Sequence, residues 1–252
     1  WRLAMQLPIP EEEGGNELAG NLSKLISFRT SQNFFNWKSW WLSIDKEPSE
    51  LFKSFSHHHQ KSIKQGLKHA ITFKPVTTAE QARKLSELYI EMYQHRKLPV
   101  IEKETHQLFF NICNYIRECN KGLMLEAVLD DQTVGGVVII FQGKTAYYYL
   151  GVTTIKYKRS IPILYPAFYH IMEYCWKSGI TIFDFGGIDP SAQKGDSMFT
   201  INSFKMGFGG KLINYPDQLV FDLNPLLSRG IEKGIQVRNT FRKWKQKKSS
   251  KS

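Results

Sequence analysis

The stretch TIFDFGGIDPSAQKGDSMFTINSFKMGFGGK, residues 181–211, decides the fold of this chain. Its first five residues are β-branched or aromatic apart from Asp184, a composition that predicts a strand. We expect the alternation of the strand to turn Asp184 away from the flanking rings, as a structural hydrogen-bonding residue. The strand stops at Gly186 and Gly187, where the backbone can turn or approach a ligand closely.

A short helix is predicted next, over residues 198–206, with Gly207 as its stop signal and a strand over 212–215 behind it. Lys205 and the glycines would then lie near the carboxyl end of a strand, where open α/β sheets bind ligands. A plainer interpretation remains open, in which the glycines only make tight turns and Lys205 is a solvated helix residue.

The rest of the chain alternates strand-like and helix-like segments. Residues 1–24 look irregular, and polar helices are expected at 48–55 and 56–69. The expected strands are 37–44, 71–76, 122–129, 134–141, 145–150 and 219–223. The expected long helices are 79–96, 105–119, 162–177 and the chain beyond 225. Hairpins between crossover helices predict an α/β fold with a mixed sheet covered by helices, in the order of an N-acetyltransferase-like (GNAT) fold.

The composition indicates a globular protein with a basic surface. The 252 residues carry 34 Lys and Arg against 23 Asp and Glu, a net charge of +11. The positive charge gathers in residues 53–74 and in the last twelve residues, which predicts phosphate-rich partners or, alternatively, a merely solvated tail. No apolar run is long enough to cross a membrane and no signal-peptide layout is seen, so we expect a cytoplasmic location, with contact at the inner face of the membrane as an option.

Two residue types suggest no chemistry of their own. Three unpaired cysteines without a CxxC spacing predict buried, reduced thiols. The consecutive histidines His57, His58 and His59 would point in different directions on a helix, so we expect surface residues and no metal site.

Three segments together resemble the Fem family of peptidoglycan-bridge aminoacyltransferases: YYYLGVT at 147–153, FDFGGID at 183–189 and FKMGFGG at 204–210. The helix SHHHQKSIKQGLKHAI at 56–71 resembles the basic helix of that family. The resemblance implies transfer of an amino acid from aminoacyl-tRNA to an amine of a UDP- or lipid-linked cell-wall precursor, without a bound cofactor.

The resemblance also implies site residues. Lys205 matches the family lysine that stabilises the developing charge, and Phe204 matches the aromatic residue beside it, although Phe204 could equally be a core residue. Asp189 is the candidate base. Arg96 is a candidate contact to acceptor phosphates, with an interaction at its helix terminus as the alternative. Further candidate substrate contacts are Tyr148, Tyr149, Tyr157, Gly186, Gly187 and Gly209.

The chain departs from the family in three ways. The basic helix has His59 and Lys64 where the family often has arginines. We interpret residues 1–70 as a remnant of a first GNAT-like half plus the basic helix, 71–225 as the acyltransferase domain and 226–252 as a helix with a basic tail. The acceptor site is then expected to be incomplete, which keeps a non-catalytic binding module open. The loop 151–163 has one glycine, whereas an acetyl-CoA enzyme needs a Gly-rich loop for the pyrophosphate. An acyl-CoA-dependent enzyme acting on a nucleotide- or lipid-linked sugar is therefore the second enzymatic hypothesis.

Overall fold

A computed structural model describes residues 2–5, 10–25, 29–31, 38–157, 160–216, 218–222 and 230. The strands are β1 Arg2–Met5, β2 Arg29–Ser31, β3 Lys38–Ser43, β4 Thr72–Pro75, β5 Gly122–Leu129, β6 Gln132–Gln142, β7 Thr145–Thr153, β8 Ile182–Gly187, β9 Lys211–Asn214 and β10 Gln218–Asp222. The helices are η1 Glu11–Glu13, α1 Gly15–Leu25, α2 Pro48–Ser54, α3 His57–Leu67, α4 Ala79–His95, α5 Glu102–Cys119, α6 Leu164–Lys177 and α7 Ser197–Met206. Among the described residues, no helix is both long and apolar enough to span a membrane.

The larger unit, residues 39–212, is built on a seven-stranded sheet in the order β4-β5-β6-β7-β8-β3-β9. Antiparallel hairpins join β5 to β6 and β6 to β7, whereas β8 lies parallel to β7 and antiparallel to β3. The predicted mixed sheet covered by helices is therefore confirmed, and the stretch that decides the fold forms β8, α7 and β9.

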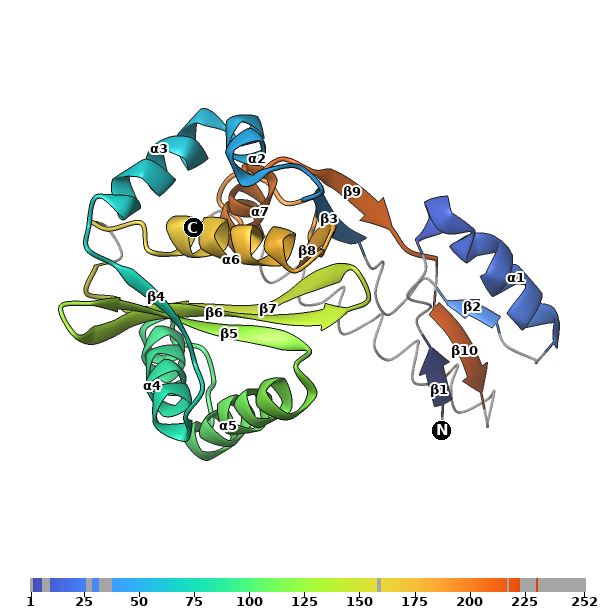
Figure 1. Cartoon of the computed structure of the whole chain (residues 1–252). Helices are drawn as coiled ribbons and strands as arrows, with labels where there is room; N and C mark the ends of the chain where they lie inside the picture. The colour runs from blue at the N-terminus through green and yellow to red at the C-terminus, as the bar shows by residue number, and fades with distance from the viewer. Residues whose placement is uncertain are drawn as a thin grey trace, which may run out of the picture. The chain divides into compact units, whose positions relative to one another are not determined.

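Helices cover both faces of this sheet, and each face has its own core (Figure 1). Helices α4 and α5 pack on one face, where Leu85, Phe109 and Val138 are buried. Helix α6 lies on the other face with α2 and α3.

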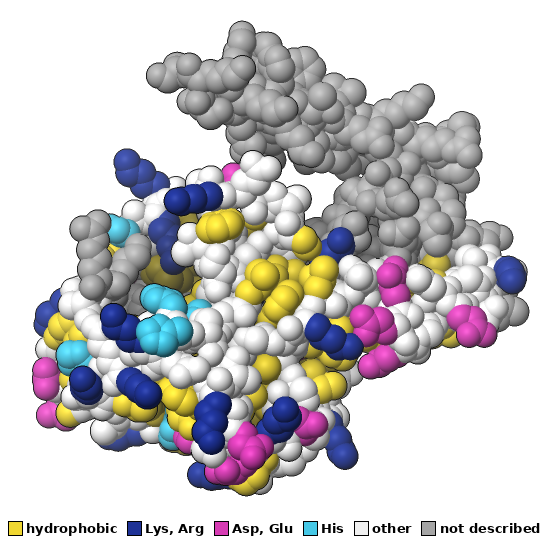
Figure 2. Space-filling view, turned by 90° about the horizontal axis from the view of Figure 1, so that it is seen from above, with side chains coloured by type: hydrophobic (Ala, Val, Ile, Leu, Met, Phe, Trp, Pro, Cys, Tyr) yellow, Lys and Arg dark blue, Asp and Glu magenta, His cyan; other side chains and the backbone are white. Residues whose placement is uncertain are grey.

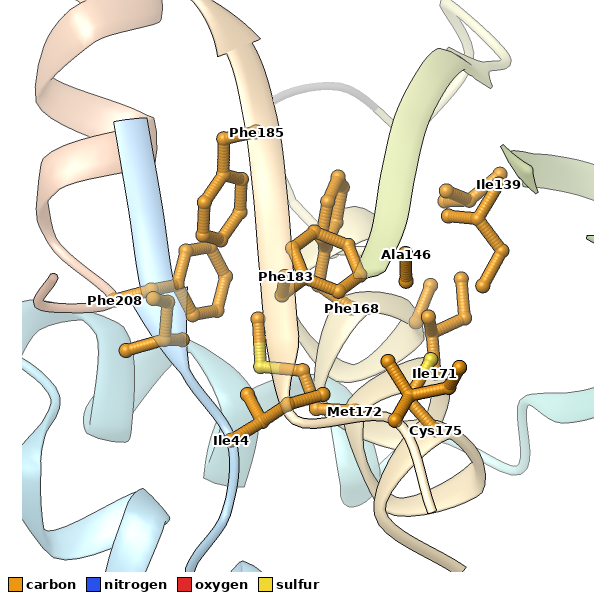
Figure 3. Packing of buried hydrophobic residues seen from close by; sticks show 14 of the residues in the cluster. Ile44, Ile139, Ala146, Phe168, Ile171, Met172, Cys175, Phe183, Phe185 and Phe208 are labelled. Atoms are coloured by element: carbon orange, nitrogen blue, oxygen red, sulfur yellow. The ribbon is translucent and has the colours of Figure 1, made fainter. Parts of the chain in front are cut away.

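Aromatic rings fill the core on the α6 face (Figure 3). The buried rings of Phe183 and Phe185 on β8 meet Phe168 of α6, and Phe208 stacks on Phe185 at 5.3 Å. Asp184, between the two strand phenylalanines, makes its side-chain hydrogen bonds elsewhere, to Ser39 and the backbone of Gly186. The expected alternation of this strand is thus confirmed, and so is the structural role of its carboxylate.

A bulge in β7 determines which side chains reach the site. Val138 pairs with Leu150 and Ile139 with Tyr148, so Tyr149 has no partner on β6. The extra residue sends Tyr148 and Leu150 to opposite faces, the first into the α6 core and the second into the α4 core. Pairing of β7 with β8 ends at Tyr147, and the last part of β7 continues beside the site paired only with β6.

The smaller unit comprises residues 1–38 and 213–252. Its described part contains the sheet β1-β10-β2, and helix α1 with the buried pair Ala19 and Leu219. The expectation that residues 1–24 are irregular was wrong, because the three glycines of that segment hid the helical spacing of Leu18 and Leu22. The division at residue 70 stays a prediction, although β3, α2 and α3 lie within the larger unit. The predicted C-terminal helix and basic tail lie outside the described residues, apart from Gly230.

Candidate active site

A pocket of about 580 Å³ lies within the larger unit, between the end of α4, the last part of β7, the start of α6, and helices α3 and α7. Its wall is mostly apolar, with a few polar side chains directed at the space. The residues that line it are His58, His59, Met92, Arg96, Tyr148, Gly151, Thr153, Ile161, Pro162, Ile163, Leu164, Tyr165, Thr200, Ile201, Ser203, Phe204 and Lys205. Four residues that the sequence assigned to the site therefore meet here: Arg96, Tyr148, Phe204 and Lys205.

Lys205 is the buried cation of the pocket. It lies in the last turn of α7 with 7% of its surface exposed, and its Nζ donates to the carbonyl oxygen of Gly187 at 2.6 Å. Burial lowers the pKa of its ammonium group, while the negative charge of Asp184 raises it. The interpretation of Lys205 as a solvated helix residue was therefore wrong.

Asp184 is the carboxylate that acts on this lysine. Burial raises its pKa, and hydrogen bonds from the Ser39 hydroxyl and from the Gly186 amide, the latter at 2.7 Å, oppose that rise. The Gly186 bond fixes a turn in which Gly186 adopts a φ of 73°, a conformation that favours glycine. This turn presents the Gly187 carbonyl to Lys205, so the FDFGG segment positions the lysine.

Tyr148 and Arg96 also line the pocket. The Tyr148 ring packs edge-on against Phe168 at 5.0 Å. Burial raises the pKa of its hydroxyl to about 12, and the Arg96 guanidinium lowers it. The hydroxyl is thus protonated at neutral pH and can donate a hydrogen bond, next to a fixed positive charge at the end of α4.

The other predicted site residues do not line the pocket. The Asp189 carboxylate accepts from the Ser191 hydroxyl at 2.6 Å and from its amide at 3.0 Å. Tyr149 is the bulged residue and is 53% exposed. Tyr157 packs on a separate core cluster. Gly209 accepts a hydrogen bond from the Trp40 indole, so its carbonyl anchors β3.

His59 is the residue of this site whose environment was not foreseen. The expectation of a surface histidine was wrong for His59, which is 3% exposed, whereas His57 and His58 are exposed. Ser56 caps α3, and His59 then falls on the same helix face as the buried Ile63 and Gly66. The helical spacing of residues 59, 63 and 66 could have predicted from the sequence that His59 faces the core.

The described residues contain no group of His, Cys, Asp or Glu that could hold a metal ion. The chemistry open to this site is that of a buried ammonium group, a guanidinium, two phenols and two imidazoles around an apolar space. Such groups can bind an anionic substrate and stabilise negative charge that develops on oxygen.

The larger unit has a mixed sheet, and its pocket lies where the parallel strands β7 and β8 separate. This arrangement defines the unit as a GNAT-type domain. The model of the acetyltransferase (GNAT) domain family matches residues 53–197, more than half of the chain, and the chain belongs to this family.

The comparison with known proteins confirms the Fem resemblance. The chain is 29% identical over 99 residues to a lipid II:glycine glycyltransferase of Staphylococcus saprophyticus, covering 39% of this chain and 24% of that protein. It is 28% identical over 163 residues to the lipid II:glycine glycyltransferase of Staphylococcus aureus, covering 61% and 38% respectively. The crystal structure of FemX superposes with a TM-score of 0.78 at 15% identity, over 92% of this chain and 74% of that one. The matched region thus spans well under half of the two curated relatives.

Proposed function

We propose that this chain is a Fem-like N-acyltransferase that moves an aminoacyl group from aminoacyl-tRNA to an amine of a lipid-linked cell-wall precursor. The observation that carries the proposal is the buried Lys205 ammonium in a pocket that also holds Phe204, Arg96 and Tyr148. The two staphylococcal relatives are named lipid II:glycine glycyltransferases, which supports the choice of acceptor.

The reaction forms a C–N bond between the acceptor amine and the ester carbonyl and breaks the C–O bond to the ribose. The carbonyl oxygen carries a negative charge in the tetrahedral intermediate. Of the three N–H bonds of Lys205, one is held by Gly187 and fixes the direction of the other two. We infer that one of these meets the oxyanion, while Phe204 packs against the end of the tRNA.

The acceptor is proposed to bind through Arg96 and Tyr148. A guanidinium and a protonated phenol that line one pocket suit a pyrophosphate, which a nucleotide- or lipid-linked precursor carries. The attacking amine must lose a proton, and the ribose oxygen must gain one. Asp189 as the base stays a prediction from sequence, since its carboxylate is held by Ser191.

The proposal is tested with purified protein, charged tRNA and two acceptors, lipid II in detergent and a UDP-linked muropeptide. Mass spectrometry of the acceptor should reveal the mass of one added aminoacyl residue that depends on charged tRNA. Addition of an acyl group from acyl-CoA instead would favour the second enzymatic hypothesis. Binding of the acceptor with no transfer from either donor would favour the binding module.

A further inference from the structure

The C-terminal turn of α7, which carries Lys205, is closed by groups from another helix. The last carbonyl groups of a helix lack partners within it. Those of Ser203, Lys205 and Met206 accept from backbone amides that follow in the chain, at 2.9–3.3 Å. The carbonyl of Phe204 instead accepts from His59 Nε2 at 2.7 Å, and the carbonyl of Gly207 accepts from the Ser56 amide at 2.8 Å.

His59 and Gly207 fit one another sterically. A Cβ atom at residue 207 would overlap the imidazole ring of His59. The φ of Gly207 is −67°, which any residue adopts, so the helix does not stop there through a left-handed glycine as the sequence suggested. Glycine is required at this position because the ring lies on it.

The orientation of the His59 ring is fixed at both nitrogens. A carbonyl oxygen only accepts, so Nε2 carries the proton toward Phe204. Nδ1 then accepts from the Ser56 hydroxyl at 2.9 Å. The ring also packs against Phe208 and Tyr165, with centroids 4.5 and 4.9 Å away.

We propose that His59 is a positioning residue for Lys205, acting through the Phe204 carbonyl and the contact with Gly207. Phe204 precedes Lys205 in the chain, so a shift of that carbonyl displaces the lysine from Gly187 and from the pocket. The kinetic part of this inference rests on the proposed acyl transfer, whereas its geometric part does not.

The first test compares His59→Leu, His59→Gln and the matched control His57→Leu, which alters an exposed histidine of the same helix. A displacement of the order of an ångström at a catalytic group costs about 100-fold in rate. His59→Leu should lower kcat by about that factor with the KM for the acceptor nearly unchanged, because the acceptor-binding groups stay in place. His59→Gln keeps an N–H near the Nε2 position and should recover most of kcat.

A second measurement does not depend on activity. Labelling by an amine-reactive ester, read by mass spectrometry, should be slow at the buried Lys205 of the native protein. It should rise in His59→Leu, relative to the exposed Lys194, and fall back in His59→Gln. If this pattern holds while no transfer is detected, the positioning inference stands and the proposed function fails. If kcat and labelling are equal in the three variants, the inference is wrong.

A double-mutant cycle covers the case in which His59→Leu fails to fold. Gly207→Ala should lower the Tm in the native background, because the new methyl group meets the ring. In the His59→Ala background the same change should be neutral or stabilising, since alanine favours the helical conformation. Equal effects in both backgrounds would overturn the steric part of the inference.

Discussion

At the scale of single residues, the site depends on a charge that the fold buries. Lys205 has lost most of its contact with water, and Asp184 and the Gly187 carbonyl partly replace that solvation. A buried cation acts more strongly on a developing oxyanion than a solvated one, because less solvent screens it. The burial therefore favours a catalytic role over an ordinary surface role.

Lys205→Met should remove most of the transfer activity. Loss of one donor to an oxyanion typically lowers the rate by about 100- to 1000-fold. The unfolding midpoint should fall without loss of the fold, since methionine fills a similar volume but leaves the buried Asp184 carboxylate without the charge of Lys205. Initial rates and thermal unfolding check both statements.

Lys194→Met is the matched control, because Lys194 is an exposed lysine of the loop before α7. It should keep native rates. Full activity of Lys205→Met would exclude Lys205 from catalysis, and a collapse of its folding would assign the lysine a structural role.

His59 should link folding stability to pH. Burial holds its pKa below 6.5, with a smaller contribution of the same sign from His58, although the hydrogen bond to Phe204 opposes both. The unfolded chain then binds more protons than the folded one below that pH, so the free energy of unfolding falls as the pH drops from 6.5 through the folded pKa.

Denaturant unfolding at about pH 7.5 and about pH 5 tests this linkage. His59→Gln should lose less stability between the two conditions than the native protein. His170, whose pKa burial also lowers, is present in both proteins and does not affect the comparison. An equal loss in the two proteins would show that protonation of His59 is not linked to folding.

At the scale of elements, periodicity and composition were enough to predict nearly every strand and helix of the larger unit. Residues 122–129 and 145–150 alternate or run apolar as strands do, and α4 starts at Ala79 as expected, after a capping box formed by Thr78 and Gln81. The bulge at Tyr149 could not be predicted, because it depends on the register with β6. It decided that Tyr148 faces the pocket and that Tyr149 does not.

The buried polar face of α7 was equally invisible in the sequence. Asn202 and Lys205 lie one turn apart and are both buried, whereas hydrophobic patterning assigns these polar residues to the solvent-exposed face of a helix. Their partners are backbone groups of Asp189 and Gly187, 13 and 18 residues away. Backbone groups carry no signature in the sequence, so the burial of these two side chains appears only in the fold.

The segment between β7 and α6 predicts weak binding of acetyl-CoA. It contains no glycine, Gly151 within β7 is the only one in residues 151–163, and α6 begins without a side-chain cap, with Leu164 and Tyr165 on the pocket wall. Bulky residues there obstruct the close backbone approach that a pyrophosphate requires. Calorimetric titration should detect no affinity of about micromolar strength or tighter. Such an affinity would favour the acyl-CoA hypothesis.

At the scale of the whole molecule, the net charge of +11 is concentrated at a few places. Six Lys and Arg residues fall within the last twelve residues, outside the part of the chain that the structure describes. Deletion of residues 241–252 should flatten the salt dependence of binding to tRNA or to anionic vesicles. With fewer phosphate contacts, fewer counterions are released on binding. An unchanged slope would leave the tail as a solvated end.

Helix α3 carries a second basic surface, and this one lies within the described residues. Its buried face carries His59 to the pocket wall, and Lys61, Lys64 and the C-cap residue Lys68 are exposed. Figure 2 shows basic and histidine side chains close to hydrophobic ones on this side of the molecule. We expect a nucleic acid lying on α3 to reach the pocket that Lys205 lines.

Replacement of the three exposed α3 lysines by glutamine tests this arrangement; they are Lys61, Lys64 and Lys68. Each phosphate contact contributes about 0.7–0.9 to the slope of log K against log salt, so the slope for tRNA should drop by roughly two. The KM for charged tRNA should rise, while the KM for the acceptor should stay constant because Arg96 and Tyr148 are untouched. The matched control removes the same charge at the other end of the sheet, through Lys121, Lys144 and Lys177. Both triple variants lower the net charge equally, so equal effects would mean that α3 has no special part in holding tRNA.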